Sequence, residues 1–335
     1  MSLKTIKFGI LGCGIAAQFH AKAIERISGA ELLGVADQKY ENACAFAKAH
    51  QTTAFESFEA MLDSEVDAVC ICTPSGFHAK QALQALSAKK HVALEKPMAF
   101  TAAEADELIA ASNQSGCLLT VVLQNRFSED VEAVRKMVAD GTLGQLAFCD
   151  LYMKYWRSPE YYANNPWRGT LALDGGGALI NQGIHGVDLM YYLVGNAKVV
   201  AGRCKTVLHD IEAEDAAVAM LEFDNGALGV IEASTCAYPG FERRLEIIGT
   251  KGSVMMKENK IETLIIDGKP VERKNADVKS GASSPTGIDI RNHAIQLENF
   301  VAAIQGDAPL AVDATEGRAA VKIVEDFYRL ARGSK

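Results

Sequence analysis

The chain has 335 residues, a length that accommodates two domains with separate hydrophobic cores. Its formal net charge of -8 argues against a nucleic-acid partner, because non-specific nucleic-acid binders carry a basic surface. An apolar strand is expected within a few residues of the start, where a signal peptide would lie, and no apolar run approaches the roughly 18 residues of a membrane span.

The eight cysteines are scattered along the chain, and their spacing predicts reduced, structural thiols and no metal site. Cys70 and Cys72 lie two residues apart in an apolar run, so both side chains face one side of a strand. A zinc site would need C-x2-C spacing with further Cys or His nearby, which the sequence does not offer. Reduced cysteines are typical of the cytoplasm, where we expect the protein.

The first third of the chain alternates short apolar strands with helical segments. This alternation predicts an α/β fold with a doubly wound parallel sheet of the Rossmann type, covered by helices on both faces. Thr101 with Glu104 three residues later matches a capping box and indicates a helix start. We expect strands at 6–11, 31–36, 66–73, 91–94 and 118–123, and helices at 16–27, 41–49, 78–88 and from 101 onward.

The pattern changes after residue 124, where strand-like runs separated by tight turns become dominant. Asp224-Asn225-Gly226 and Asp267-Gly268 separate such runs, as do residues 249–252, and they are typical of hairpins. They predict a large open, mostly antiparallel sheet, which begins near 144–155. Its own helices cover one face, so we expect a second subunit to cover the other, in a homodimer or homotetramer. Helices are expected at 127–140, 291–305 and 315–331, and a mobile loop at 280–287.

A glycine-rich turn of the form G-x-G-x-x-A follows the first strand. Gly12 permits a tight turn, Gly14 lets the backbone approach a pyrophosphate, and Ala17 stands where helix and strand pack closely. The N–H groups of the next helix would attract the phosphates. Asp37 ends the second strand, where a carboxylate accepts both ribose hydroxyls and repels a 2′-phosphate. The turn therefore predicts NAD. NADP stays possible because Lys39 could offset the repulsion, and Asp37 could simply begin a turn.

The tripeptide Glu95-Lys96-Pro97 follows a strand of the same sheet. Lys96 therefore lies at the carboxyl edge, where ligands bind in such sheets. Pro97 makes the local backbone rigid, and Glu95 could hold the lysine in place. An ammonium that donates to a substrate hydroxyl helps that oxygen lose its proton as hydride leaves the carbon. The alternative is that Lys96 is a solvated surface charge.

Three polar residues follow a run of glycines in a predicted helix. Asn181, His185 and Asp188 are spaced i, i+4 and i+7, so they should share one helical face. His185 is the candidate general base, and Asp188 could orient its ring from the next turn. The alternative is that His185 is a structural histidine.

Two Trp-Arg pairs flank a tyrosine-rich stretch and suggest a sugar site. Aromatic faces stack on pyranose rings, and guanidinium groups bind carboxylates or phosphates. Arg168, in the second pair, is the first candidate for an anionic or hydroxyl contact, and Arg126 is the second. The alternative is that these pairs simply pack at a domain junction.

Taken together, these motifs resemble the glucose–fructose oxidoreductase / inositol dehydrogenase (Gfo/Idh/MocA) family. The C-terminal third matches the family in general pattern, including residues 312–318 before the last helix. The residues that carry the resemblance are the turn at 12–17, Thr73-Pro74 with His78, Glu95-Lys96-Pro97, Gln124-Asn125-Arg126, and the run from Asp174 through Asn181 and His185 to Asp188.

The resemblance implies an NAD(P)-binding Rossmann domain at 1–123 and a substrate-binding and oligomerisation α/β domain at 124–335. It implies NAD(P)-dependent oxidation of a hydroxyl on a sugar, sugar acid, nucleotide-sugar or cyclitol, with Lys96 as catalytic lysine and His185 as active-site histidine. Asn181 falls where many members have an aspartate, and an amide cannot stabilise an imidazolium as a carboxylate would. The expected sites are catalytic Lys96, His185, Asn181 and Asp188; cofactor-binding Gly12, Cys13, Gly14, Ile15, Ala17, Asp37, Thr73, Pro74, His78, Glu95, Lys96 and Asn125; and substrate-binding Lys96, Arg126, Tyr155, Arg168, Asn181 and His185.

The segment from Trp167-Arg168 to His185 most resembles the branch that includes nucleotide-sugar 3-dehydrogenases. Two alternatives stay open. Some members use NAD in a closed redox cycle to cleave glycosides. Others are non-enzymatic, dinucleotide-responsive regulators, which tend to lose the lysine or the histidine.

Overall fold

The computed structural model describes residues 5–272 and 290–333, and the chain folds into two compact units. The first unit contains residues 1–124 and 290–318, and the second contains 125–289 and 319–335. The first unit thus ends close to the expected boundary at 123/124. Residues 290–318, which we expected in the second domain, belong to the first unit. The loop expected at 280–287 lies outside the described residues.

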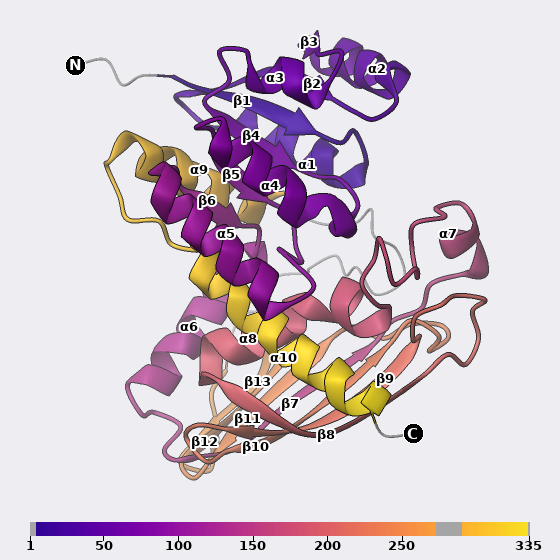
Figure 1. Ribbon diagram of the computed structural model, residues 1–335. Coiled ribbons are helices and arrows are strands. Elements are labelled where there is room, and N and C mark those ends of the chain that lie inside the picture. The colour runs from indigo at the N-terminus through magenta and orange to yellow at the C-terminus, as the bar shows by residue number, and fades with distance from the viewer. Residues whose placement is uncertain (1–4, 273–289, 334–335) are drawn as a thin grey trace. The chain divides into compact units, whose positions relative to one another are not determined.

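The first unit is built on a six-stranded sheet in the order β3-β2-β1-β4-β5-β6 (Figure 1). Every neighbouring pair is parallel. This order confirms the doubly wound Rossmann sheet, whose strand order reverses next to β1 and creates the crevice where ligands bind. The strands are β1 (Ile6–Leu11), β2 (Ala30–Ala36), β3 (Thr53–Ala54), β4 (Ala68–Ile71), β5 (His91–Leu94) and β6 (Leu119–Val121).

Helices cover both faces of this sheet. The capping box is confirmed, because Thr101 Oγ1 accepts from Glu104 N at 3.2 Å and Glu104 Oε2 accepts from Thr101 N at 3.1 Å. The helices are α1 (Ile15–Ile24), α2 (Tyr40–His50), α3 (Phe58–Leu62), α4 (His78–Ser87), α5 (Ala102–Ser115) and α9 (Arg291–Gln305), with a 3-10 turn at Ser75–Phe77.

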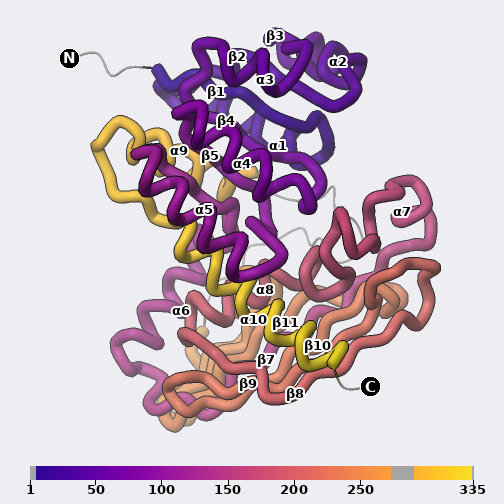
Figure 2. The backbone as a smooth tube through the Cα atoms, in the orientation of Figure 1, coloured from indigo at the N-terminus to yellow at the C-terminus, as the bar shows by residue number. Residues whose placement is uncertain are grey.

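Helix α9 explains why residues 290–318 belong to the first unit. Its apolar face carries Leu297, Phe300 and Val301, which lie in the same buried core as Phe8 and Ile10 of β1. The rings of Phe8 and Phe300 lie 6.3 Å apart. The tube in Figure 2 shows α9, in yellow, beside the indigo and violet strands of this unit.

The second unit is built on an eight-stranded sheet in the order β14-β13-β12-β11-β7-β10-β9-β8. Only β7 and β10 pair in parallel, which confirms the mostly antiparallel sheet. The three expected turns each join neighbouring antiparallel strands. The strands are β7 (Leu146–Lys154), β8 (Ala197–Lys205), β9 (Ala216–Phe223), β10 (Leu228–Ser234), β11 (Arg244–Gly249), β12 (Gly252–Lys257), β13 (Lys260–Ile266) and β14 (Lys269–Pro270).

Helices cover the inner face of the larger sheet. Helix α8 (Ile184–Val194) packs on β7, and the π-helix Ala178–Gly183 that precedes it packs on β9 and β10. Strand β9 alternates between buried residues such as Leu221 and exposed residues such as Met220, so its other face is solvent-accessible in the single chain. The remaining helices are α6 (Glu129–Ala139) and α7 (Pro159–Ala163), with a 3-10 turn at Gln124–Phe127. Helix α10 (Ala314–Gly333) begins in the first unit and belongs to the second from residue 319 onward.

Candidate active site

The glycine turn after β1 has the shape that a pyrophosphate requires. Gly12 has φ +90°, and a Cβ on it would lie 2.9 Å from the carbonyl oxygen of Cys72, so only glycine fits there. A Cβ on Gly14 would meet nothing within 4 Å, which leaves open space above the backbone. Gly14 caps α1 without a side-chain hydrogen bond, so the first N–H groups of α1 are available to an anion. Ile15 is exposed beside them, and Ala17 is buried.

Asp37 lies at the carboxyl end of β2, next to this turn. Its Oδ2 accepts from the backbone N of Cys13 at 2.8 Å. Its Oδ1 accepts from Lys39 N at 2.9 Å and from Asn42 Nδ2 at 3.2 Å. These bonds hold the carboxylate beside the turn. Asp37 therefore does begin a turn, and it also places a negative charge where a ribose hydroxyl would bind.

The residues at this edge thus fit a dinucleotide. The turn and the N-terminus of α1 would hold the pyrophosphate, and Asp37 would hold a ribose. When bound, the nicotinamide supplies the acceptor for a hydride.

Both ring nitrogens of His78, an expected cofactor contact, have partners inside the protein. Its side chain is buried, with Nδ1 2.7 Å from the carbonyl oxygen of Pro97 and Nε2 2.9 Å from that of Thr73. The hydroxyl of Thr73 is bonded to Gln81. Burial lowers the pKa of His78. His78 therefore joins the loop after β4, which includes Pro74, to the loop after β5, and positions the tripeptide.

Lys96 is the second residue after β5 and is half-buried at the carboxyl edge of the sheet. Its backbone N donates to Glu95 Oε2 at 3.2 Å. The other carboxylate oxygen of Glu95 lies 2.9 Å from Nε2 of His20 on α1, whose side chain is fully buried. Glu95 therefore links the helix after the glycine turn to the backbone of Lys96.

His20 and Glu95 form a buried ion pair. Burial alone would raise the pKa of Glu95, but the hydrogen bond and charge of His20 outweigh it and lower that pKa to about 2. Burial opposes charge on His20, yet the neighbouring sulfurs of Cys72 and Cys70 raise its pKa well above the ordinary value. The ion pair of His20 and Glu95 therefore contacts the backbone of Lys96 through the Glu95 carboxylate.

Arg126 is not placed as a substrate contact. Its side chain is 2% exposed, and its Nε donates to both carboxylate oxygens of Asp188, at 2.9 and 3.2 Å. Its Nη2 donates to Asp188 Oδ1 at 2.5 Å, and its guanidinium lies 4.5 Å from the ring centroid of Tyr192. This buried pair anchors α8 to the segment before α6. The amide oxygen of Asn125, an expected cofactor contact, accepts from Asn259 at 2.9 Å within the second unit.

The expected single α-helical face at 181–188 is wrong for its first member. Asn181 lies in the π-helix, and α8 begins only at Ile184, so the i, i+4 spacing does not describe one regular helix. Asn181 Nδ2 donates to the buried carboxylate of Asp174, and its Oδ1 accepts from Gln182 Nε2 at 2.6 Å. The carboxylate of Asp174, seven residues earlier in the chain, therefore fixes the amide of Asn181. His185 is half-buried in the first turn of α8.

The arginines of the two Trp-Arg pairs lie around Tyr161. The guanidinium of Arg168 lies 4.0 Å from the Tyr161 ring centroid, and that of Arg157 lies 5.6 Å from it. Arg157 is buried and donates to Gln182 Oε1 at 2.7 Å. The hydroxyl of Tyr155, an expected substrate contact, donates to Glu258 at 3.3 Å, and burial raises its pKa.

No motif in the sequence indicates a role for His20, Asp174 or Gln182. His20 lies on the buried face of α1 with Ala17 and Ala21, and a polar residue on an apolar helical face is a signal of a buried hydrogen bond. Nothing in the spacing of Asp174 and Asn181 indicated their contact, because it forms across the glycine run and the π-helix.

Comparison with known proteins places the chain in a family. The profile of an oxidoreductase family with an NAD-binding Rossmann fold matches residues 6–123, and the Gfo/Idh/MocA C-terminal domain matches residues 131–255. The uncharacterized oxidoreductase YrbE of Bacillus subtilis is 30% identical over 268 residues, which cover 78% of this chain and 76% of that protein. The chain belongs to the Gfo/Idh/MocA family. The resemblance seen in its motifs is confirmed, and it is an oxidoreductase with an NAD-binding domain.

Two further relatives indicate the chemistry found in the Gfo/Idh/MocA family. The myo-inositol 2-dehydrogenase of Thermotoga maritima is 24% identical, covering 94% of this chain and 93% of that protein. The WlbA dehydrogenase of Bordetella pertussis, solved in complex with NADH and UDP-GlcNAcA, is 31% identical with a TM-score of 0.87, covering 99% and 98% of the two chains.

Within residues 5–272 and 290–333, no group of three or more His, Cys, Asp or Glu side chains could hold a metal ion. The same residues include no helix with the length and apolarity that crossing a bilayer requires.

Proposed function

We propose that the chain catalyses NAD-dependent oxidation of a hydroxyl on a sugar, sugar acid, nucleotide-sugar or cyclitol. The observation that carries this proposal lies within the first unit. Lys96, held through Glu95, follows β5 at the same sheet edge as the dinucleotide turn after β1, two strands or roughly 10 Å away. A lysine fixed there can reach a substrate carbon beside a nicotinamide.

In the proposed mechanism two side chains act on one substrate hydroxyl. Lys96 donates a hydrogen bond to the hydroxyl oxygen and stabilises the negative charge that develops on it. His185 removes the hydroxyl proton as hydride leaves the carbon. Asn181, oriented by Asp174, holds the substrate, and Asp188 stays bonded to Arg126.

We infer a preference for NAD over NADP from Asp37. Its carboxylate, held by three hydrogen bonds, repels a 2′-phosphate, and rearranging it would break these bonds. The NADH complex of WlbA supports this preference.

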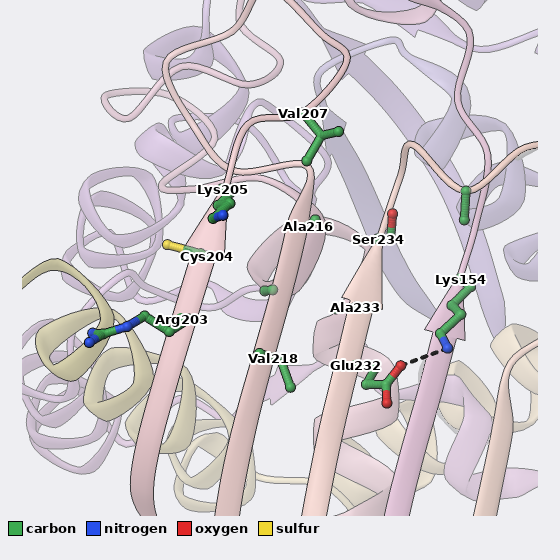
Figure 3. A pocket seen from close by; sticks show the side chains of 12 residues that line it. Lys154, Arg203, Cys204, Lys205, Val207, Ala216, Val218, Glu232, Ala233 and Ser234 are labelled. Carbon is green, nitrogen blue, oxygen red and sulfur yellow. Dashed lines mark ion pairs between the residues drawn. The ribbon is translucent and has the colours of Figure 1, made fainter.

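We also propose that a second copy of the chain covers the open face of the large sheet. This face exposes Val218 and Met220 of β9 and Leu228 of β10, which are 45%, 56% and 52% exposed. Figure 3 shows part of the face, where the ion pair of Lys154 and Glu232, 2.6 Å long, lies beside apolar side chains. Alternating apolar and oppositely charged groups suit a self-complementary interface. In this arrangement the first unit binds the cofactor, and the second binds substrate and the partner copy.

A cytoplasmic location is the last part of the proposal. All eight cysteines are free thiols, as expected in a reducing compartment.

A panel of sugars, sugar acids, cyclitols and UDP-sugars, with NAD or NADP, tests the function by the absorbance of the reduced nicotinamide. We expect NADH formation with at least one class. Release of nitrophenol from a nitrophenyl glycoside without net NADH would instead indicate the glycosidase reaction. A flat response to every compound would favour a dinucleotide-responsive regulator.

A further inference from the structure

Arg168 is a half-buried cation whose side chain has no polar partner among residues 5–272 and 290–333. Its backbone N donates to the carbonyl oxygen of Asn165 at 2.9 Å. Its guanidinium makes no hydrogen bond and no ion pair with these residues, and it lies 4.0 Å from the ring centroid of Tyr161 and 5.0 Å from that of Trp167. Its Nε is buried with no partner in the same set. An arginine carries five N–H donors, and leaving the buried donor at Nε unsatisfied costs stability.

The surroundings of Arg168 add a second positive charge. Arg157 shares the Tyr161 ring, and the two guanidinium groups repel each other. Burial, offset only in part by Asp174 and reinforced by Arg157, lowers the pKa of Arg168 to about 10, so it stays charged at neutral pH. The carboxylate of Asp174 binds Asn181 and the backbone N of Gly169 instead.

The segment that carries these arginines is held rigidly. His209 Nε2 lies 2.9 Å from the carbonyl oxygen of Arg157, and its Nδ1 lies 3.0 Å from Asp215. The hydroxyl of Tyr161 accepts from Gln182 at 3.1 Å, which lies in the π-helix that precedes α8 and His185. The cationic site is therefore fixed beside the element that carries the proposed base.

We propose that Arg168, with the field of Arg157, binds an anionic group of the substrate, a carboxylate or a phosphate, and so selects acidic sugars over neutral ones. The inference rests on the proposed function for its substrate, but it concerns binding and needs no turnover. A planar guanidinium binds either anion through two parallel hydrogen bonds, which would give acceptors to the N–H donors of Arg168 that have no partner. Neutral sugars and cyclitols offer no group that balances the two charges.

The chain offers a direct probe of this site, because its only two tryptophans are Trp156 and Trp167. Tryptophan emission of the full-length protein would be titrated with matched pairs of compounds that differ in one anionic group. The carboxylate pairs are glucuronate with glucose and UDP-glucuronate with UDP-glucose, and the phosphate pair is glucose 6-phosphate with glucose. We expect the anionic member of at least one pair to bind roughly tenfold more tightly or better, and that pair identifies the anion.

Two variants complete the test. Arg168→Gln should remove the preference within the pair, whereas Arg135→Gln should retain it. Arg135 is the matched control, since its guanidinium also lies 4.0 Å from a tyrosine ring centroid, that of Tyr192 on α8. Equal binding within all three pairs, or a preference that survives Arg168→Gln, would overturn the proposal. Because binding is read without NADH formation, an inactive protein that still discriminates the pairs would count against the proposed function alone.

Discussion

At the scale of residues, the buried ion pair of His20 and Glu95 connects the helix after the glycine turn to the proposed catalytic lysine, Lys96. Glu95 accepts from the backbone of Lys96 with one oxygen and contacts His20 of α1 with the other. Breaking a buried pair by neutralising one partner typically costs 3–5 kcal/mol, because the other charge is left uncompensated. The pair therefore bears on both stability and the position of the lysine.

The stability contribution of Glu95 should depend on pH. Its folded pKa of about 2 is below the ordinary 4.5, so the contribution is full above the ordinary value and is lost as pH falls toward 2. We expect Glu95→Gln to lower the free energy of unfolding in urea by about 3 kcal/mol at pH 7 and by only about 1 kcal/mol at pH 3. The exposed Glu107→Gln serves as control and should change little. An equal loss at both pH values would contradict the ion pair.

At the scale of elements, the π-helix before α8 is braced by a buried carboxylate. Glu214 Oε1 accepts from Gly177 N at 3.3 Å, from Leu179 N at 3.0 Å and from the hydroxyl of Tyr328 on α10 at 2.8 Å. Burial raises the pKa of Glu214. The brace fixes the start of the segment that leads to Asn181 and His185.

Tyr328→Phe removes one donor from this brace without creating a large cavity. We expect a loss of about 1–3 kcal/mol in the free energy of unfolding, since a buried carboxylate oxygen loses a hydrogen bond. Tyr192→Phe is the matched control, because its hydroxyl donates to Glu132 at the surface, and it should cost less than about 1 kcal/mol. Similar losses in the two variants would show that the buried bond to Glu214 stabilises the fold no more than the surface bond to Glu132.

Local patterns in the sequence predicted most elements of both sheets. The capping box at Thr101, the Asp-Asn-Gly turn before β10 and the glycine turn all involve hydrogen bonds or φ angles set by neighbouring residues. Contacts between distant residues could not be predicted in this way. His20 and Glu95 lie 75 residues apart, and α9 joins a core formed by the start of the chain.

In the candidate site, too, local motifs were predictable from the sequence, whereas contacts between distant residues were not. The motifs and the chemistry of the side chains assign Arg126 to the substrate and His78 to the cofactor. The structure gives both of them partners inside the protein, the carboxylate of Asp188 and the carbonyl oxygens of Thr73 and Pro97. A motif identifies which residues matter, but burial decides whether a side chain faces a ligand or a neighbour.

At the scale of the whole molecule, the open face of the eight-stranded sheet is the feature that calls for a partner. Met220 stands on β9 opposite Val230 of β10 and Ala201 of β8, in the middle of the exposed apolar row. We expect Met220→Glu to convert the assembly to monomers, because each interface would bury an added charge. Light scattering after size-exclusion chromatography would measure this. A monomeric native protein, or an assembly unchanged by the substitution, would contradict the proposed interface.

The proposed mechanism assigns the substrate hydroxyl proton to His185 and the developing negative charge to Lys96. The most direct test is the rate of NADH formation by His185→Ala, measured with the best substrate of the panel at saturating NAD. We expect a rate roughly 10²–10⁴-fold below that of the native protein, because a general base contributes to that extent. NAD affinity should stay unchanged within about twofold, because the dinucleotide turn belongs to the first unit and His185 to the second. Near-native turnover by His185→Ala would contradict the proposed mechanism.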